Sequence, residues 1–174
     1  MGRTGRDRRD GIRMGQIAVI GAADATPELK EAARTIGALI AANHETLVCG
    51  GLGGVMEAAC TGAHEEGGLT VGIVPDTGNG NAALDIVIRT GLGHARNVLV
   101  AQSADAVIAV GGSYGTLSEI AVALKTGRPV FGYRTWNIDG VIACATPEEA
   151  VLMAVRAARL SRSYRSCRYD EGSP

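Results

Sequence analysis

Residues 106–130 have the sequence AVIAVGGSYGTLSEIAVALKTGRPV, and this stretch decides the fold. A fully apolar run of five residues begins it, a glycine-rich turn follows, and residues 116–125 then carry apolar side chains at helical spacing until Gly127 and Pro129 end the pattern. An apolar strand that turns directly into a helix is typical of a parallel sheet with both faces covered. The stretch therefore predicts one strand–turn–helix unit of an α/β protein.

The rest of the chain repeats this alternation. Further strands are predicted at residues 16–21, 46–49, 69–74, 85–88, 130–133 and 141–143. Helices are predicted at residues 55–66 and 95–104, after the capping residues Thr26 and Thr146, and at residues 116–125. The order predicts a single doubly wound, mainly parallel sheet with helices on both faces, a Rossmann-like fold. Ligands of such sheets bind beyond the carboxyl ends of the strands, where the strand order reverses.

Length and composition narrow the class of protein. The chain has 174 residues, of which 46% are hydrophobic and 20% charged, which predicts one domain. No apolar run approaches the ~20 residues of a membrane-spanning helix, and no apolar stretch of a secretory signal follows the Arg-rich start. We therefore expect a cytoplasmic protein without a membrane partner. The cysteines have no C-x-x-C spacing, which suits reduced thiols, and with the scattered histidines they indicate no metal site.

Positive charge is concentrated at the two ends of the chain. Residues 1–13 and residues 156–174 each hold five Arg against two acidic residues, a net charge of +3 at each end. Both ends are short and lack periodicity, so residues 1–13 and 161–174 are predicted to be flexible tails around a domain of residues 14–160. Basic tails can bind nucleic acid. The simpler interpretation is that the arginines of these tails are exposed to solvent without a partner, so we expect no nucleic-acid partner.

Two strand-to-helix junctions are rich in glycine. The candidate ligand-binding residues in and near them are Gly21, Gly50, Gly51, Gly53, Gly54, Gly111, Gly112, Ser113, Tyr114, Gly115 and Thr116. Glycine lets an anion approach the backbone, and a helix N-terminus favours negative charge. The two junctions together predict a phosphate or other oxyanion site, with tight turning and close helix packing as the structural alternative. Neither junction has the spacing of an NAD-binding fingerprint or of a P-loop.

Arg96 and Glu119 are candidate functional residues with structural alternatives. Arg96 stands at the start of a predicted helix, where the dipole disfavours a cation unless an anion is near, and its guanidinium suits bidentate contact with phosphate. The alternative for Arg96 is a salt bridge to Asp85 or Glu57. Glu119 follows Thr116 at capping-box spacing, which favours a structural role in which Thr116 is the N-cap.

Three stretches together resemble a known family. TGLGHARN (residues 90–97), the stretch at residues 106–130 and CGGLGGVMEAA (residues 49–59) are similar to the molybdenum-cofactor carrier proteins, a group within the Lonely Guy superfamily. The resemblance spans about residues 16–160. It implies a homo-oligomer, a dimer or a tetramer, that requires no cofactor of its own. It also implies that the Gly-rich loops bind a small phosphorylated ligand such as a nucleoside monophosphate or the molybdenum cofactor.

The resemblance also implies residue roles. In the Lonely Guy enzymes, a P-G-G-x-G-T-x-x-E motif and an upstream Arg cleave the N-glycosidic bond of a nucleoside 5′-monophosphate and release the base and ribose 5-phosphate. The Glu of the motif falls on Glu119, its Gly-Thr on Gly115 and Thr116, and the upstream Arg on Arg96. Glu119 would assist water or stabilise the ribosyl cation, and Arg96 would hold the substrate.

Two departures from the enzyme motif favour the carrier branch. Residues 111–113 are Gly-Gly-Ser where the enzymes have Pro-Gly-Gly, and Asn97 replaces the Lys of their Arg-Lys pair. Tyr114 is the aromatic residue in a candidate loop, so a pocket for a base would be formed mainly by aliphatic side chains. The sequence predicts a cytosolic binding protein for a phosphorylated, nucleotide-like or pterin-like ligand, with a nucleoside 5′-monophosphate phosphoribohydrolase as the alternative.

Overall fold

A computed structural model describes residues 14–170, with side chains described through residue 163. Seven strands pair in parallel in the order β4-β3-β2-β1-β5-β6-β7. Their bounds are β1 Gln16–Gly21, β2 Thr46–Cys49, β3 Thr70–Val74, β4 Ile86–Arg89, β5 Ala106–Val110, β6 Val130–Tyr133 and β7 Val141–Ala143. The structure confirms the predicted fold class, with every strand pairing parallel.

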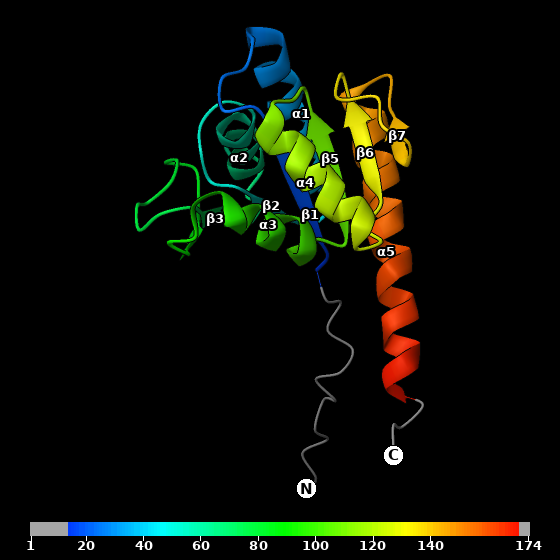
Figure 1. Cartoon of the computed structure of the whole chain (residues 1–174). Coiled ribbons are helices and arrows are strands. Elements are labelled where there is room, and N and C mark those ends of the chain that lie inside the picture. Colours follow the sequence, from blue (N-terminus) through cyan, green and yellow to red (C-terminus); the bar gives the residue numbers. More distant parts are fainter. Residues whose placement is uncertain (1–13, 171–174) are drawn as a thin grey trace, which may run out of the picture.

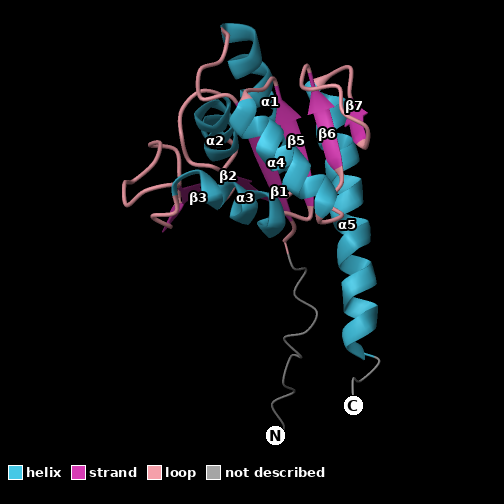
Figure 2. Cartoon of the chain, viewed as in Figure 1, coloured by secondary structure: helices cyan, strands magenta, loops and turns pink. Residues whose placement is uncertain are grey.

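Helices cover both faces of the sheet (Figures 1 and 2). On one face lie α1 (Pro27–Ala42), α2 (Val55–Glu65) and α5 (Pro147–Asp170). On the other face lie α3 (Asn97–Ser103), which follows the short 3-10 helix η2 (Gly93–Arg96), and α4 (Tyr114–Lys125). The two layers fit the near-continuous apolar central strands, because these strands bury both of their faces.

The core divides into two apolar clusters, one on each side of the sheet. Along β1, Ile17 and Val19 belong to the cluster beneath α1, α2 and α5, whereas Ala18 and Ile20 belong to the cluster beneath α3 and α4. Successive side chains of a strand point to opposite faces, so the run Ile-Ala-Val-Ile supplies both clusters. β5 alternates in the same way, and these central strands are the most deeply buried part of the molecule.

The strand order reverses between β1 and β5. From β1 the chain builds β2, β3 and β4 on one side, and it then crosses over to build β5, β6 and β7 on the other. Gly21 at the end of β1 is in register with Val110 at the end of β5. Connections that leave neighbouring strands in opposite directions open a crevice at this edge. The two Gly-rich junctions begin at this edge, at the ends of β2 and β5.

The C-terminal boundary differs from the one predicted. α5 continues as a helix to Asp170, beyond residue 160, and extends past the sheet (Figure 1). Arg162 contributes to this extension, because its guanidinium forms an ion pair of 2.6 Å with the buried carboxylate of Glu45, which also accepts a hydrogen bond from the Gly15 N–H. The periodicity of this segment is weak, and a long-range ion pair leaves no mark in it.

Residues 1–13 and 171–174, predicted as tails, lie outside the described residues. Within the described part of the chain, no helix has the length and apolarity needed to cross a membrane.

Candidate ligand-binding site

A buried arginine lies at the carboxyl edge of the sheet. Arg96, at the end of η2, is 5% exposed. A Cβ atom added to Gly50, the residue after β2, would lie 2.6 Å from both Nη atoms of Arg96. The absence of a side chain at Gly50 therefore lets the guanidinium lie directly against the backbone. The first Gly-rich junction and Arg96 are therefore in direct contact.

Glu119 is the acidic partner of Arg96. Its Oε1 accepts a hydrogen bond of 3.2 Å from Nη1 of Arg96, and both side chains are about 6% exposed. The suggested alternatives, Asp85 and Glu57, are not the partner: Asp85 accepts hydrogen bonds from Thr70 instead. The pair joins η2 to the second turn of α4, and it brings together the two residues that the sequence singles out as catalytic candidates.

Asn97 connects Arg96 to the start of α4. Its Oδ1 accepts from Nη1 of Arg96 at 2.8 Å, and its Nδ2 donates to Oγ of Ser118 at 2.8 Å. Ser118 in turn donates to the carbonyl oxygen of Gly115 at 2.7 Å. This chain fixes the guanidinium relative to the second Gly-rich junction. Ser118 is a site residue that the sequence analysis did not select.

The helix cap at α4 is shifted from its predicted place. α4 begins at Tyr114 with Ser113 as the N-cap, and the Ser113 N–H donates to Oγ1 of Thr116 at 3.4 Å. Thr116 is thus the third residue of the helix rather than its N-cap, and Glu119 does not bond back to it. The T-x-x-E spacing suggested a capping box, but the preceding Ser113 takes that position. The Glu119 carboxylate therefore takes no part in the cap and pairs with Arg96 instead.

Burial raises the pKa of Glu119 to about 7, although the positive charge of Arg96 opposes the shift. A carboxylate removed from water loses hydration, and the single long hydrogen bond to Arg96 does not replace it. Near neutral pH the carboxyl group is therefore partly protonated. The pair as a whole carries net positive charge below pH 7.

Four other candidate glycines, in or near the two junctions, fall into two groups. A Cβ at Gly21 would lie 2.5 Å from Val55, and Gly54, with φ +65°, lies against the carbonyl oxygens of Ala22 and Ala23. These two glycines allow α2 to pack closely on β1 and on the loop after it. Close helix packing is the structural alternative to anion binding that the sequence offered for these positions. Gly53 and Gly115, in contrast, have room for a Cβ atom, whose nearest neighbours would lie at an ordinary van der Waals distance of 3.7 Å. The structure does not require glycine at those two positions for packing.

Two thiols lie beneath the first junction. Sγ of Cys49, at the end of β2, is 3.4 Å from Sγ of Cys60 in α2, and it also accepts from the Gly51 N–H at 3.3 Å. The hydrogen bond with Cys60 lowers the pKa of Cys49, and the same contact raises the pKa of Cys60. Both thiols are fully buried, and with Cys144 they are free cysteines, as expected for this part of the chain. Cys167 lies outside the residues whose side chains are described.

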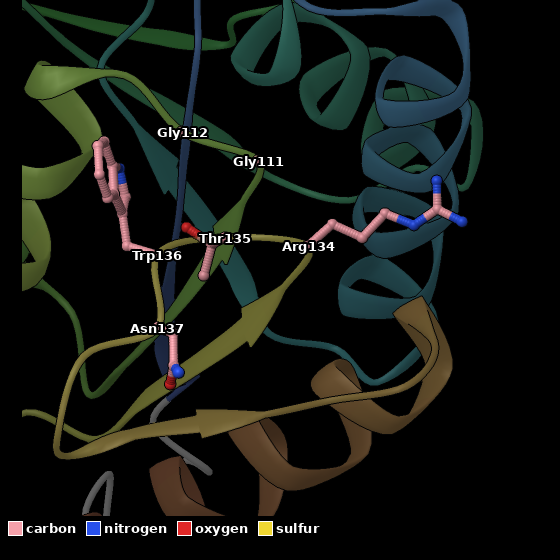
Figure 3. Close-up of a pocket in the computed structure, with 6 residues that line it drawn as sticks. All are labelled: Gly111, Gly112, Arg134, Thr135, Trp136 and Asn137. Atoms are coloured by element: carbon pink, nitrogen blue, oxygen red, sulfur yellow. The ribbon is translucent and has the colours of Figure 1, made fainter.

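The sequence analysis missed the segment after β6. Residues 134–137 (Arg-Thr-Trp-Asn) and the glycines 111 and 112 line a pocket of about 360 Å³ (Figure 3). The segment carries little glycine and does not precede a helix, so the pattern used for the other junctions did not select it. Two features could have found it: it holds the only tryptophan of the chain, and it follows a predicted strand at the carboxyl edge.

Comparison with known proteins agrees with this fold. A family model described as the SLOG cluster4 family matches residues 14–160. A protein of Archaeoglobus fulgidus is 48% identical over 142 residues, which cover 80% of this chain and 94% of the relative. The structure of the molybdenum cofactor binding protein from Rippkaea orientalis is 38% identical, with a TM-score of 0.78, and the match covers 82% of this chain and 96% of that one.

A second solved structure agrees. The molybdenum cofactor carrier protein from Chlamydomonas reinhardtii is 35% identical, with a TM-score of 0.76, and the match covers 82% of this chain and 98% of that one. The resemblance to molybdenum-cofactor carrier proteins that the sequence suggested is therefore confirmed. By the extent of the family match and the identity of its relatives, the chain belongs to the SLOG cluster4 family.

Proposed function

We propose that this protein binds a small phosphorylated ligand, nucleotide-like or pterin-like, at the carboxyl edge of its sheet, and that the molybdenum cofactor is one such ligand. Two solved relatives are a molybdenum cofactor binding protein and a molybdenum cofactor carrier protein, which supports a cofactor-binding protein with a Rossmann-like fold. The ligand is cargo in this proposal, and it occupies the crevice where the strand order reverses.

The observation that carries the proposal is the state of Arg96. Its guanidinium is almost completely buried, its Nε has no hydrogen-bond partner among the described residues, and Glu119 neutralises it only in part. A buried guanidinium with unused donors is costly unless an anion completes its contacts. A phosphate or another oxyanion is the group that its planar donor fork matches.

The chain offers complementary groups around Arg96. Gly50 provides bare backbone on one side of the guanidinium, and Asn97 and Glu119 hold it in place on the other. The turn at Gly111 (φ +58°) leads into α4, whose N-terminal N–H groups favour negative charge. The phosphate of the ligand would be held by Gly111, Gly112, Ser113 and Arg96, and a phosphorylated pterin would be bound through that same group.

Calorimetric titration tests the proposal, with guanosine 5′-monophosphate, neopterin phosphate and isolated molybdenum cofactor as probes. We expect saturable binding that Arg96→Gln weakens by at least tenfold. Arg128→Gln is the matched control, because Arg128 also has a buried, unpartnered Nε but precedes β6 at the opposite edge of the sheet. Absence of binding by every probe, or equal losses in the two variants, would contradict the proposal.

One observation favours a second candidate function, a nucleoside 5′-monophosphate phosphoribohydrolase. Glu119, with its pKa near 7, lies 3.2 Å from Arg96, so a carboxyl group able to exchange a proton near neutral pH accompanies a cation that can hold a phosphate. Incubation with AMP followed by chromatography measures release of the base. Release that Glu119→Ala abolishes in a folded protein supports the enzyme, and no release from the wild type leaves the binding protein.

We further propose a cytoplasmic homo-oligomer, a dimer or a tetramer. Support comes from apolar side chains that are exposed just before η2 and on α3: Leu92 is 53% exposed, and Val98 and Leu99 are each 38% exposed. Light scattering measures the mass in solution. A Val98→Asp, Leu99→Asp double variant is expected to be a monomer, and a monomeric wild type would contradict the proposal.

A further inference from the structure

The pocket at the end of β6 is distinct from the Arg96–Glu119 pair. We call it the Trp136 pocket and define it by Gly111, Gly112 and residues 134–137. Its volume of about 360 Å³ falls in the range of about 300–1,000 Å³ typical of small-molecule sites. It shares the turn at Gly111 and Gly112 with the proposed phosphate site. A ligand whose phosphate lies on this turn therefore has the pocket next to it.

Trp136 forms one side of the Trp136 pocket, and its ring is in contact with that of Tyr114. The rings of Trp136 and Tyr114 lie 6.3 Å apart at an interplanar angle of 32°, and they remain 38% and 83% exposed. The indole Nε1 donates to the carbonyl oxygen of Ser113 at 3.4 Å, and a Cβ on Gly112 would lie 2.7 Å from this nitrogen. The missing side chain at Gly112 thus lets the indole rest on the turn, where a flat ring can stack.

The polar groups of the pocket suit the edge of a nitrogen heterocycle. Oγ1 of Thr135 is buried and has no hydrogen-bond partner among the described residues. Asn137, beside it in the lining, has an amide that can both donate and accept. A buried hydroxyl without a partner costs free energy unless a bound molecule supplies one. The lining contains no carboxylate.

The charged side chain of the lining, Arg134, points away from Trp136 (Figure 3). Arg134 and Trp136 leave the loop in opposite directions, and the Arg134 side chain extends toward α1 (Figure 3). Its guanidinium carbon lies 5.4 Å from the centroid of the Tyr133 ring. The centre of the pocket is therefore lined by neutral hydrogen-bonding groups and an aromatic face, a composition that favours an uncharged flat ring over a second phosphate.

We infer that the Trp136 pocket holds the planar nitrogen heterocycle of the ligand, a purine or a pterin, stacked on Trp136 with its polar edge toward Thr135 and Asn137. This inference rests on the proposed function, because it places the ring relative to a phosphate on the Gly111–Ser113 turn. It differs from the expectation that mainly aliphatic side chains would form a pocket for a base. Trp136 determines specificity for the ring, and the turn supplies affinity for the phosphate.

The single tryptophan of the chain makes the test direct, because all indole fluorescence comes from the pocket. Guanosine 5′-monophosphate and neopterin phosphate, corrected for their own absorbance, are expected to quench this fluorescence saturably. Ribose 5-phosphate, which lacks the nitrogen heterocycle, is expected to bind without quenching. Calorimetry on the same samples measures binding independently of fluorescence.

Three variants separate stacking from folding. Trp136→Ala is expected to weaken the heterocyclic probes by roughly 5- to 150-fold, the usual effect of losing one stacking face, and to leave ribose 5-phosphate unchanged. Trp136→Phe, which keeps an aromatic face, is expected to retain most of the affinity. Thr135→Val removes the hydroxyl at nearly constant volume and is expected to weaken the heterocycles about tenfold without lowering the melting temperature.

The outcomes distinguish the two proposals. Binding of the phosphorylated heterocycles with unchanged fluorescence and unchanged affinity in Trp136→Ala overturns the ring assignment and leaves the proposed function intact. Equal losses for the heterocycles and for ribose 5-phosphate in Trp136→Ala also overturn it, because the effect would not depend on the ring. No calorimetric binding of any probe to the wild type overturns both proposals.

Discussion

The Nη1 atom of Arg96 lies 3.2 Å from Oε1 of Glu119, and the two side chains are only about 6% exposed. The residues are 23 positions apart in the chain and come from different helical segments, η2 and α4. Burial makes the pair sensitive to protons, because removal from water raises the pKa of Glu119 to about 7. The charge of the candidate site therefore depends on pH in the physiological range.

The first prediction concerns stability. The pKa of Glu119 is higher in the folded protein than the ordinary value of 4.5, so the folded state binds the proton more tightly, and the stabilisation present below pH 4.5 is lost as pH rises through about 7. The loss amounts to about 3 kcal/mol at 1.36 kcal/mol per pKa unit. The Glu119→Gln variant lacks this contribution. The difference in free energy of unfolding between the wild type and the variant should therefore change by about 3 kcal/mol between acidic and alkaline pH. Urea unfolding at pH 4.5, 6 and 8 measures it, and a constant difference would contradict the assigned pKa.

The second prediction concerns protons taken up on binding. A phosphate beside Glu119 adds negative charge and should raise its pKa further, so binding near pH 7 should draw protons from the buffer. Calorimetry in phosphate-free buffers of different ionisation enthalpy measures this uptake. Glu119→Gln should reduce it by the share that Glu119 contributes. If the variant and the wild type take up equal numbers of protons, the anion does not bind near Glu119.

The third prediction compares two glycines of one junction. A Cβ at Gly50 would lie 2.6 Å from the Arg96 guanidinium, whereas at Gly53 the nearest atom would be 3.7 Å away. Gly50→Ala should displace the guanidinium and weaken phosphate-ligand binding by tenfold or more, while Gly53→Ala should bind as the wild type does. The affinities of the two variants for guanosine 5′-monophosphate measure the effect. Equal affinities would argue against a role for Arg96 in binding.

The fourth prediction concerns the backbone of Arg134. This residue has φ +49°, a left-handed conformation that costs a residue with a side chain about 1–2 kcal/mol. Arg134→Gly should relieve that cost, offset by about 0.5–1 kcal/mol of glycine flexibility, and so raise the free energy of unfolding by up to about 1 kcal/mol. His44, with φ +59° after α1, is the matched control, and His44→Gly should give a similar gain. Thermal unfolding measures both, and a clear loss in Arg134→Gly would show that the side chain supports the loop.

The fifth prediction concerns the anchor of α5. Removal from water would raise the pKa of the Glu45 carboxyl, but the hydrogen bonds and charge of Arg162 and the Gly15 N–H outweigh that effect and hold its pKa below 4.5. The stabilisation is therefore present above pH 4.5 and lost as pH falls below it. Arg162→Ala should cost about 1–3 kcal/mol near pH 7 and much less near pH 3. Arg156→Ala, an exposed position on the same helix, should be nearly neutral. Equal effects of the two variants would contradict the anchoring role.

Local pattern predicted most of the fold because the central strands bury both faces, and because α1 and α4 begin at local capping signals. Thr26 accepts from the Leu29 N–H and Pro27 opens α1, as their order in the sequence predicts. The T-x-x-E spacing at Thr116 misled because Ser113, three residues earlier, offers an equally good cap and starts α4 sooner. Capping residues compete locally, and spacing alone does not decide between overlapping candidates.

From the sequence alone came the doubly wound sheet, the carboxyl ends of its strands as the expected place for a ligand, and Arg96 and Glu119 as residues of interest. Those conclusions depend on periodicity and turn chemistry, which act over a few residues. The tertiary structure decided the Arg96–Glu119 partnership, the guanidinium against Gly50, the Trp136 pocket and the Arg162–Glu45 anchor, which joins residues 117 positions apart. Partners brought together by strand pairing and helix packing leave no periodic trace in the chain, because burial and charge compensation act between neighbours in space.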